Sequence, residues 1–197
     1  MHLIKEFINK NIIVFIVAVS VFAVGIVLGS LYAVNIGASD ADELKQLLNQ
    51  YITLDAADKI TFWDIVQCEC TNHLKFVPLI LICAMDYRLI IPCGIALAFR
   101  GYQLGFSVSF ICSNFGKTGI LITTASAVFS YFFTVPVYLF LFVIMVDYAT
   151  VRKNNINTRE KAKTFELVIL FVIAYAVLFC AACIEGVLLP IFIDFLN

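Results

Sequence analysis

The residue types that could carry chemistry are few, and most lie inside apolar stretches. Arg100 opens the run RGYQLGF, residues 100–106. A charge near the centre of a bilayer costs at least ~2.5 kcal/mol, so such a residue normally faces a bundle interior or a water-filled cavity. Gly101, Gly105, Ser109 and Ser113 recur every four residues, and small side chains on one helix face let helices pack closely. Two interpretations follow: a packing seam with Arg100 hydrogen-bonded to carbonyls, or a role in transport or conformational switching.

Glu185 is the acidic residue to weigh as a partner for Arg100. It lies toward the outer part of the last apolar run, at ~1.5 Å of rise per residue, whereas Arg100 is nearer the middle of the bilayer. A direct pair would need a tilted helix, so a solvated or backbone-capping Glu185 is favoured. The candidate structural or functional residues are therefore Arg100, Gly101, Gly105, Pro136, Glu185 and Pro190.

No set of residues predicts catalysis or a bound cofactor. Cys68, Cys70 and His73 could bind zinc, but a closed site wants four ligands at paired spacings. A clear second pair is lacking, because Cys180 and Cys183 lie in an apolar run and are expected in the core. We therefore predict no metal. His2 and His73 are both expected outside the bundle, and the sequence has no HExxH, GxSxG or phosphate-loop pattern. The seven cysteines lie mostly in apolar runs, and their odd number argues against a complete disulfide framework.

The composition explains why these few polar residues are unusual. The chain has 197 residues, of which 62% are hydrophobic and 14% charged, and its mean hydropathy is +1.00. A soluble domain carries about 25% charged residues, and so large an apolar surplus cannot be buried in one small core. Lipid must therefore be the solvent. The net charge of −1 gives no basic patch for a nucleic acid.

The first 75 residues predict a membrane helix followed by a soluble segment. Ile12–Val34 is uncharged and reaches the ~20 residues that a crossing needs. It exceeds the ~7–15 residues of a signal-peptide core, so we expect a retained helix. Residues 36–75 are rich in acidic side chains. A capping box at Ser39 and Asp42 precedes an apolar stripe at helical spacing, and a second short helix is expected from Thr61.

The remainder predicts a bundle of membrane helices. We expect a short helix over residues 74–85, a turn at Asp86-Tyr87-Arg88, and a helix to about Ser113, with a break at Arg100-Gly101 as the alternative. A turn at residues 114–117 leads into residues 118–147, where Pro136 predicts a kink or two half-helices. The basic loop 150–163 precedes a last helix over residues 165–195.

These elements make an all-α, polytopic membrane helix bundle with about five transmembrane helices and a short extracytoplasmic helical segment. Its parts are residues 1–35, 36–75 and 76–197. With the N-terminus in the cytoplasm, eight of the 13 Lys and Arg residues lie inside and four outside, as the positive-inside rule favours. We therefore predict a multi-pass protein of the cell membrane whose acidic segment and C-terminus are extracytoplasmic.

The order of these features resembles the stage II sporulation protein M family of bacterial membrane proteins. The run from Arg100 to Phe106 resembles the family's basic residue, Gly, and Gly-Phe four residues later. Val135-Pro136-Val137-Tyr138 resembles an aliphatic-Pro-Ala-Tyr stretch, with Val137 in place of Ala. Ile184-Glu185-Gly186 with Pro190 resembles the Glu and Pro pattern of the last helix. A Pro that the family has a few residues before the second stretch is missing, since Tyr131 and Phe132 stand in that region.

The resemblance implies a non-enzymatic scaffold of the engulfment complex in endospore formation. Its expected partners are membrane lipids and other membrane proteins, including peptidoglycan hydrolases that would carry out the chemistry. The alternative is a permease-like subunit of a transporter, in which Arg100, Glu185 and the break at Pro136 would line a substrate path.

Overall fold

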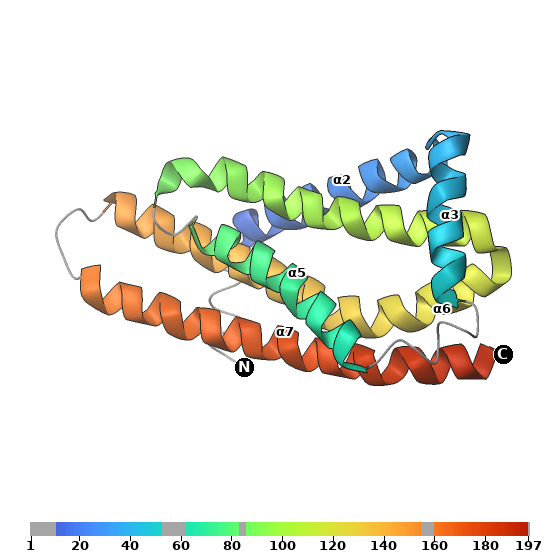
Figure 1. Cartoon of the computed structure of the whole chain (residues 1–197). Coiled ribbons are helices and arrows are strands. Elements are labelled where there is room, and N and C mark those ends of the chain that lie inside the picture. The colour runs from blue at the N-terminus through green and yellow to red at the C-terminus, as the bar shows by residue number, and fades with distance from the viewer. Residues whose placement is uncertain (1–10, 53–61, 83–85, 155–159, 197) are drawn as a thin grey trace.

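The computed structural model describes residues 11–52, 62–82, 86–154 and 160–196, and its regular elements there are all helical. Figure 1 shows them as a bundle of long helices with one short helix at its end. The elements are α2 (Ile12–Val34), α3 (Ala38–Ile52), α5 (Phe62–Ile82), the 3-10 turn η1 (Tyr87–Leu89), α6 (Ile90–Asn154) and α7 (Glu160–Leu196). The predicted all-α bundle is confirmed.

Helix α6 is a hairpin of two long arms. Gly116 has φ +54° and ψ −128°, which is not helical, and the chain folds back there. The first arm is residues 90–115 and the second arm is residues 117–154. A side chain at such a φ would be strained, so the glycine permits the reversal. The predicted turn at residues 114–117 is therefore confirmed.

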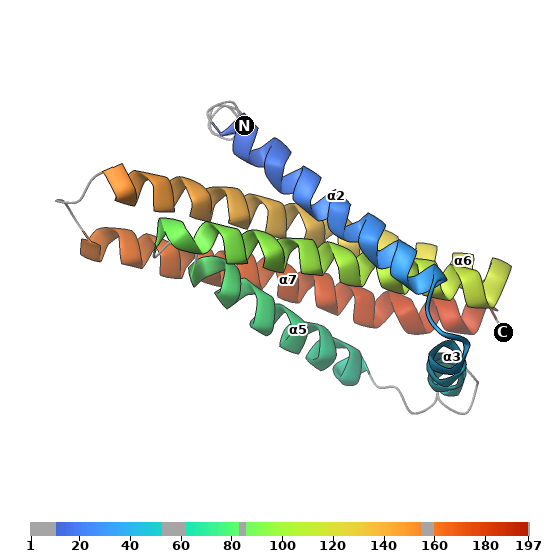
Figure 2. The same cartoon turned by 90° about the horizontal axis from the view of Figure 1, so that it is seen from above.

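Four stretches are long and apolar enough to cross a bilayer: Ile12–Val34, Tyr87–Asn114, Tyr131–Val151 and Val168–Val187. They are α2, the two arms of α6, and α7, so the chain is a multi-pass membrane protein. Helix α5 is shorter and runs beside the middle part of these helices toward the end of the bundle where α6 begins (Figures 1 and 2). It is the fifth helix of the bundle, although its first half is more polar than the other four.

Helix α5 also corrects the expected division of the chain. We predicted a short helix from Thr61 and another over residues 74–85, but one helix, Phe62–Ile82, continues through Pro78. The expected boundary between residues 75 and 76 therefore falls inside α5. The physical reason is a continuous buried stripe, which includes Val66, Val77 and Ile80 and packs into the bundle. This burial outweighs the loss of one backbone hydrogen bond at the proline.

The turn at Asp86 is confirmed over the alternative break at Arg100. Asp86 caps η1 by accepting a hydrogen bond from the backbone N–H of Arg88 at 3.0 Å. Arg100 and Gly101 lie inside the first arm of α6. Of the two alternatives expected at Pro136, a kink or two half-helices, the second is wrong, because the second arm stays helical through this residue. A membrane helix tolerates a proline where neighbouring helices support the freed backbone groups.

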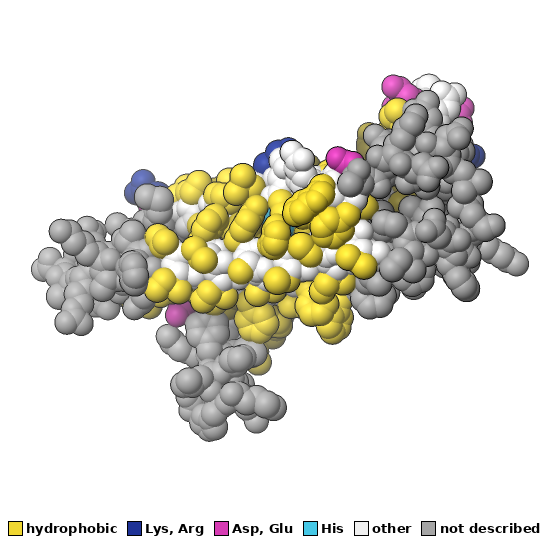
Figure 3. Space-filling model, turned by 60° about the horizontal axis from the view of Figure 1, so that its bottom comes forward, with side chains coloured by type: hydrophobic (Ala, Val, Ile, Leu, Met, Phe, Trp, Pro, Cys, Tyr) yellow, Lys and Arg dark blue, Asp and Glu magenta, His cyan; other side chains and the backbone are white. Residues whose placement is uncertain are grey.

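The interior of the bundle is apolar and draws on every long helix. Its most buried side chains include Ala18 of α2, Val77 of α5, Leu97 and Met145 of the two arms of α6, and Leu178 of α7. Large hydrophobic side chains also cover much of the outer surface. Figure 3 shows one face on which they dominate the described surface. A surface of this kind is stable against lipid and not against water.

Helix α3 is set apart from the bundle. Figure 1 shows it lying across the end at which α6 folds back, and Figure 2 shows it almost end-on, so its axis runs across the direction of the long helices. Asp42, Glu43 and Leu47 are exposed on it, while Ala41 and Leu44 are half-buried. The predicted amphipathic helix is therefore present, and it stands at one end of the membrane-spanning bundle.

Candidate functional site

Two pairs of glycines hold α2 against the first arm of α6. A Cβ atom built on Gly25 would fall on the carbonyl oxygen of Ala98, and one built on Gly29 would fall on that of Tyr102. In the other direction, a Cβ on Gly101 would fall on the carbonyl oxygen of Phe22. The two backbones are therefore in direct contact, which only glycine allows.

Gly105 completes this crossing, since a Cβ there would fall on the carbonyl oxygen of Ile26. The Ser30 hydroxyl also donates a hydrogen bond to the Gly105 carbonyl at 3.3 Å. The sequence indicated a small-residue face on the helix that carries Gly101 and Gly105. Only the structure shows that this face packs on α2, with four glycines interlocked. The predicted packing seam at Gly101 and Gly105 is confirmed. The hydrogen bonds from Arg100 to carbonyls that were expected with it are not found in the described residues, where Arg100 donates to the side chain of Gln103.

Arg100 points into the bundle, on the opposite side of this arm from α2. Its side chain is 13% exposed, and its Nη1 atom donates a hydrogen bond to Oε1 of Gln103 at 3.2 Å. The guanidinium carbon lies 5.3 Å from the ring centre of Phe76 and 5.5 Å from that of Tyr138. Such cation-π contacts contribute about 0.5–2 kcal/mol each, more where water is excluded. The predicted inward orientation is confirmed.

The carboxylate that faces Arg100 belongs to Glu69 of α5. The Nη2 atom of Arg100 lies 4.0 Å from Oε2 of Glu69. Sequence reasoning weighed Glu185 as the partner and overlooked Glu69, because residues 36–75 were expected outside the bundle. Glu185 lies on α7 and is half-buried. Tyr131 connects it with this region, since Tyr131 interacts electrostatically with Arg100, Glu69 and Glu185.

His73 lies inside the bundle, so the expectation that both histidines lie outside it is wrong for this residue. It is 1% exposed, and its Nδ1 atom forms a 3.0 Å hydrogen bond with the Tyr138 hydroxyl. Its Nε2 atom lies 3.7 Å from Oε2 of Glu69, one turn earlier on α5. The expectation was wrong because residues 62–82 form one helix that packs into the bundle, and His73 is one of its buried residues. His2 lies outside the described residues.

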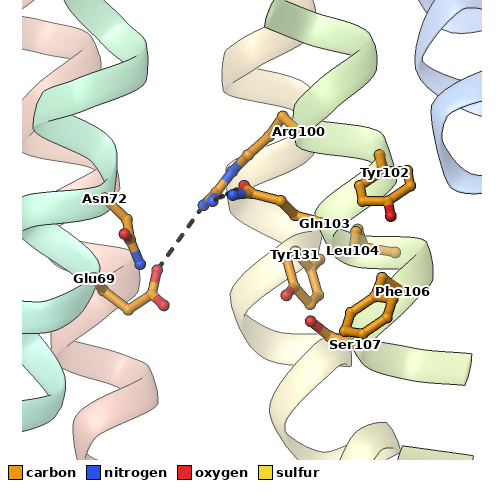
Figure 4. Close-up of a pocket in the computed structure, with 9 residues that line it drawn as sticks. All are labelled: Glu69, Asn72, Arg100, Tyr102, Gln103, Leu104, Phe106, Ser107 and Tyr131. Carbon is orange, nitrogen blue, oxygen red and sulfur yellow. Dashed lines mark hydrogen bonds and ion pairs between the residues drawn. The ribbon is translucent and has the colours of Figure 1, made fainter. Parts of the chain in front are cut away.

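A polar cavity of about 280 Å³ lies between α5 and the two arms of α6. Figure 4 shows Glu69 and Asn72 on one side and Arg100 and Gln103 opposite them. Its polar lining is Glu69, Asn72, Arg100, Gln103, Ser107 and Tyr131. Charged and polar side chains thus surround a space at the depth of the membrane helices. A site of this kind can bind a small polar molecule.

A row of stacked aromatic rings borders this cavity and was not foreseen. The rings of Phe99, Tyr102, Phe106 and Phe110 follow one another on the first arm of α6, with centres 5.7–6.4 Å apart. Their spacing of three or four residues puts them on one helix face, a pattern that the sequence contains. Tyr32 of α2 packs on this row beside the glycine crossing.

The other candidate residues lie apart from the cavity. Pro136 is exposed on the second arm of α6. Gly186, next to Glu185, packs on Phe62 of α5, whose ring would be 2.9 Å from an added Cβ. Pro190 is in α7, and its side chain lies outside the described residues. Thr134 is buried, and its hydroxyl has no hydrogen-bond partner in the described part of the chain.

The cysteines considered for zinc do not gather around His73. Cys68 is exposed and Cys70 half-buried on α5, while His73 is hydrogen-bonded to Tyr138. Across the described ranges, no three His, Cys, Asp or Glu residues lie close enough together to hold a metal ion.

The fold and the cavity define a multi-pass helical membrane protein with a buried cluster of charged and polar side chains. The chain matches no family model, no curated protein and no solved structure. Its function must therefore be argued from its own residues.

Proposed function

We propose that the chain is a membrane scaffold without enzymatic activity of its own, in the manner of the stage II sporulation protein M family. In this role it would sit in the cell membrane during engulfment and hold peptidoglycan-degrading partners at their place of action. The N-terminus would be cytoplasmic, and α3 and the C-terminus extracytoplasmic. Membrane lipids and other membrane proteins would be its partners.

The observation that carries this proposal is where the resembling motifs lie. Gly101 and Gly105 of the first motif form the backbone contact with α2. Tyr138 of the second motif lies under the Arg100 guanidinium. Gly186 of the third packs on α5. Each motif thus supplies a contact between helices, as expected of residues that maintain a rigid assembly.

The position of α3 supports an extracytoplasmic partner surface. It lies across the end of the bundle (Figures 1 and 2), and its side chains at Asp42, Glu43 and Leu47 are exposed. The positive-inside rule favours this end as the outer one, because α2 reaches it after crossing from a basic N-terminus. A hydrolase bound there would face the cell wall.

Site-specific photo-cross-linking in the chain's own organism tests the proposal. A photoreactive amino acid at Leu47 of α3 should capture a cell-wall hydrolase. The same amino acid at Arg88, an exposed residue at the other end of the bundle, should not. Purified full-length chain should release no fragments from peptidoglycan. Failure to capture a hydrolase from Leu47, Asp42 or Glu43 would contradict the scaffold role.

The polar cavity favours a second candidate, a permease-like subunit of a transporter. Arg100 and Glu69 face a space of about 280 Å³ among membrane helices, as a solute path requires. The cross-linking experiment distinguishes the two roles. Capture of an ATPase from Arg88, with no hydrolase captured from α3, would favour the permease. A sporulation hydrolase gene or an ATPase gene next to the chain's own gene would favour the first or the second role, respectively.

A further inference from the structure

The two charges that face each other in the cavity have unused hydrogen-bonding capacity. A guanidinium has five N–H donors, and within the described residues Arg100 donates only to Gln103. The carboxylate of Glu69 lies 4.0 Å from Arg100 and 3.7 Å from His73. Both distances are longer than the ~2.7–2.9 Å of a charged hydrogen bond. Within the same residues, Glu69 therefore accepts no hydrogen bond.

The cavity that the two charged groups line is polar and large enough for a small molecule. It measures about 280 Å³, and Asn72, Ser107 and Tyr131 line it beside the two charged groups. Buried charges need polar partners, because their transfer out of water is costly. The groups in the cavity supply too few partners for each other, so the remaining ones must come from whatever fills the space.

The arrangement of charge selects the class of molecule. An anion would satisfy Arg100 and be repelled by Glu69, and a cation would do the reverse. A zwitterion satisfies both. The rings of Phe76 and Tyr138 also hold the guanidinium plane in place, which suits the two-pronged binding of a carboxylate or phosphate.

We propose that this cavity binds a compact zwitterion, with its anionic group on Arg100 and its primary ammonium group on Glu69. Two sources share this chemistry: the phosphoethanolamine headgroup of a membrane lipid, and a free amino acid. The inference goes beyond the scaffold role, because the cavity could be occupied whether or not the chain recruits a hydrolase.

Titration of the purified full-length chain tests the proposal without any substitution. In lipid nanodiscs or detergent, the probes are phosphatidylethanolamine against phosphatidylcholine, and glycine against its trimethylated form, glycine betaine. The two members of each pair carry the same charges, but a quaternary ammonium has no N–H to donate to Glu69. We expect about tenfold tighter binding of one primary-ammonium probe, since a charged hydrogen bond is lost in its counterpart.

Variants locate the binding in the cavity. Glu69→Gln should abolish the preference for the primary ammonium, and Arg100→Gln should weaken both members of the pair by about tenfold or more. The matched controls are Glu43→Gln on α3 and Arg88→Gln near η1, which make the same chemical changes at exposed positions. They should bind as the wild-type chain does.

Each outcome is decisive. Preference for phosphatidylethanolamine supports a lipid headgroup, and preference for glycine supports a free solute. If the wild-type chain shows neither preference, the proposal is overturned. A preference that persists in Glu69→Gln overturns it as well. If that variant does not fold, the comparison of probes on the wild-type chain still decides, and cross-linking from α3 remains a separate test of the scaffold role.

Discussion

The Nδ1 atom of His73 lies 3.0 Å from the hydroxyl oxygen of Tyr138, and each residue is 1% exposed. The two residues are 65 positions apart and join α5 to the second arm of α6. Their hydrogen bond is therefore a polar link between two helices, next to Glu69 and Arg100. Within the membrane no water replaces a lost partner, so the bond should contribute measurably to stability.

Tyr138→Phe removes the hydroxyl and keeps the ring that packs on Arg100. We expect a loss of about 1 kcal/mol of unfolding free energy, since polar links between membrane helices average ~0.6 kcal/mol and reach ~1.7. Unfolding in mixed micelles measures it. Tyr32→Phe is the control, because Tyr32 is largely exposed and its ring contacts are kept. A double-mutant cycle with His73→Phe checks the link. If the losses of unfolding free energy in the two single variants simply add in the double variant, the hydrogen bond does not contribute to stability.

Gly29→Ala should destabilise the chain, because the new methyl group would fall on the carbonyl oxygen of Tyr102. Forced overpacking of this kind costs about 1–3 kcal/mol, and here backbone is the obstacle. Gly105→Leu should be worse still. Gly94→Ala is the control. Gly94 lies on the first arm of α6, as Gly105 does, but nothing lies within 4 Å of its added Cβ.

That control should be neutral or raise stability by up to ~1 kcal/mol, as alanine favours a helix over glycine. Thermal unfolding in detergent compares the variants. Equal melting temperatures for Gly29→Ala and Gly94→Ala would show that α2 and α6 do not touch through these glycines.

Gly116→Ala should cost about 1–3 kcal/mol, because φ +54° with ψ −128° suits glycine and strains any other residue. Asparagine should not rescue the turn, since it tolerates the left-handed helical region and not this ψ. Gly37→Ala is the control, as it has open space around an added Cβ and no positive φ. The unfolding midpoints of the variants measure this difference. An unchanged midpoint for Gly116→Ala would contradict the strained backbone conformation at the reversal.

Arg100→Leu should lower stability by about 1–3 kcal/mol, because it leaves the half-buried Glu69 without its facing charge. Glu69→Gln in the same chain should restore part of the loss. The stability of Arg100→Lys should lie between those of the wild-type chain and Arg100→Leu. Lysine keeps the charge but loses the planar contacts with Phe76 and Tyr138. Arg88→Leu, at the exposed turn, should change little. If the double variant is no better than Arg100→Leu, the two side chains are not coupled.

Cysteines placed at the two ends of the bundle test the orientation. A membrane-impermeant thiol reagent should label Glu43→Cys on α3 in intact cells. It should label Arg88→Cys only after permeabilisation, because the proposed orientation, which follows the positive-inside rule, puts that end in the cytoplasm. The wild-type chain corrects for its own seven cysteines. The reverse pattern would invert the topology.

Local features of the sequence determined several of the helices and turns, but not the continuity of α5 through Pro78. The uncharged run gave α2 with both of its bounds, Asp86 predicted the turn before α6, and the residues around Gly116 predicted the reversal. These features depend on hydrophobic length, capping and backbone conformation, which act between residues close in the chain. The low content of charged residues likewise indicated that the surface of the bundle faces lipid.

Tertiary structure decided which helix faces meet. It set Gly25 and Gly29 against Gly101 and Gly105, put Glu69 opposite Arg100, and buried His73 against Tyr138. The sequence contained each of these residues, but the pairing depends on the crossing angle and axial register of two helices. Those quantities follow from packing along their whole lengths, so no short motif could determine them.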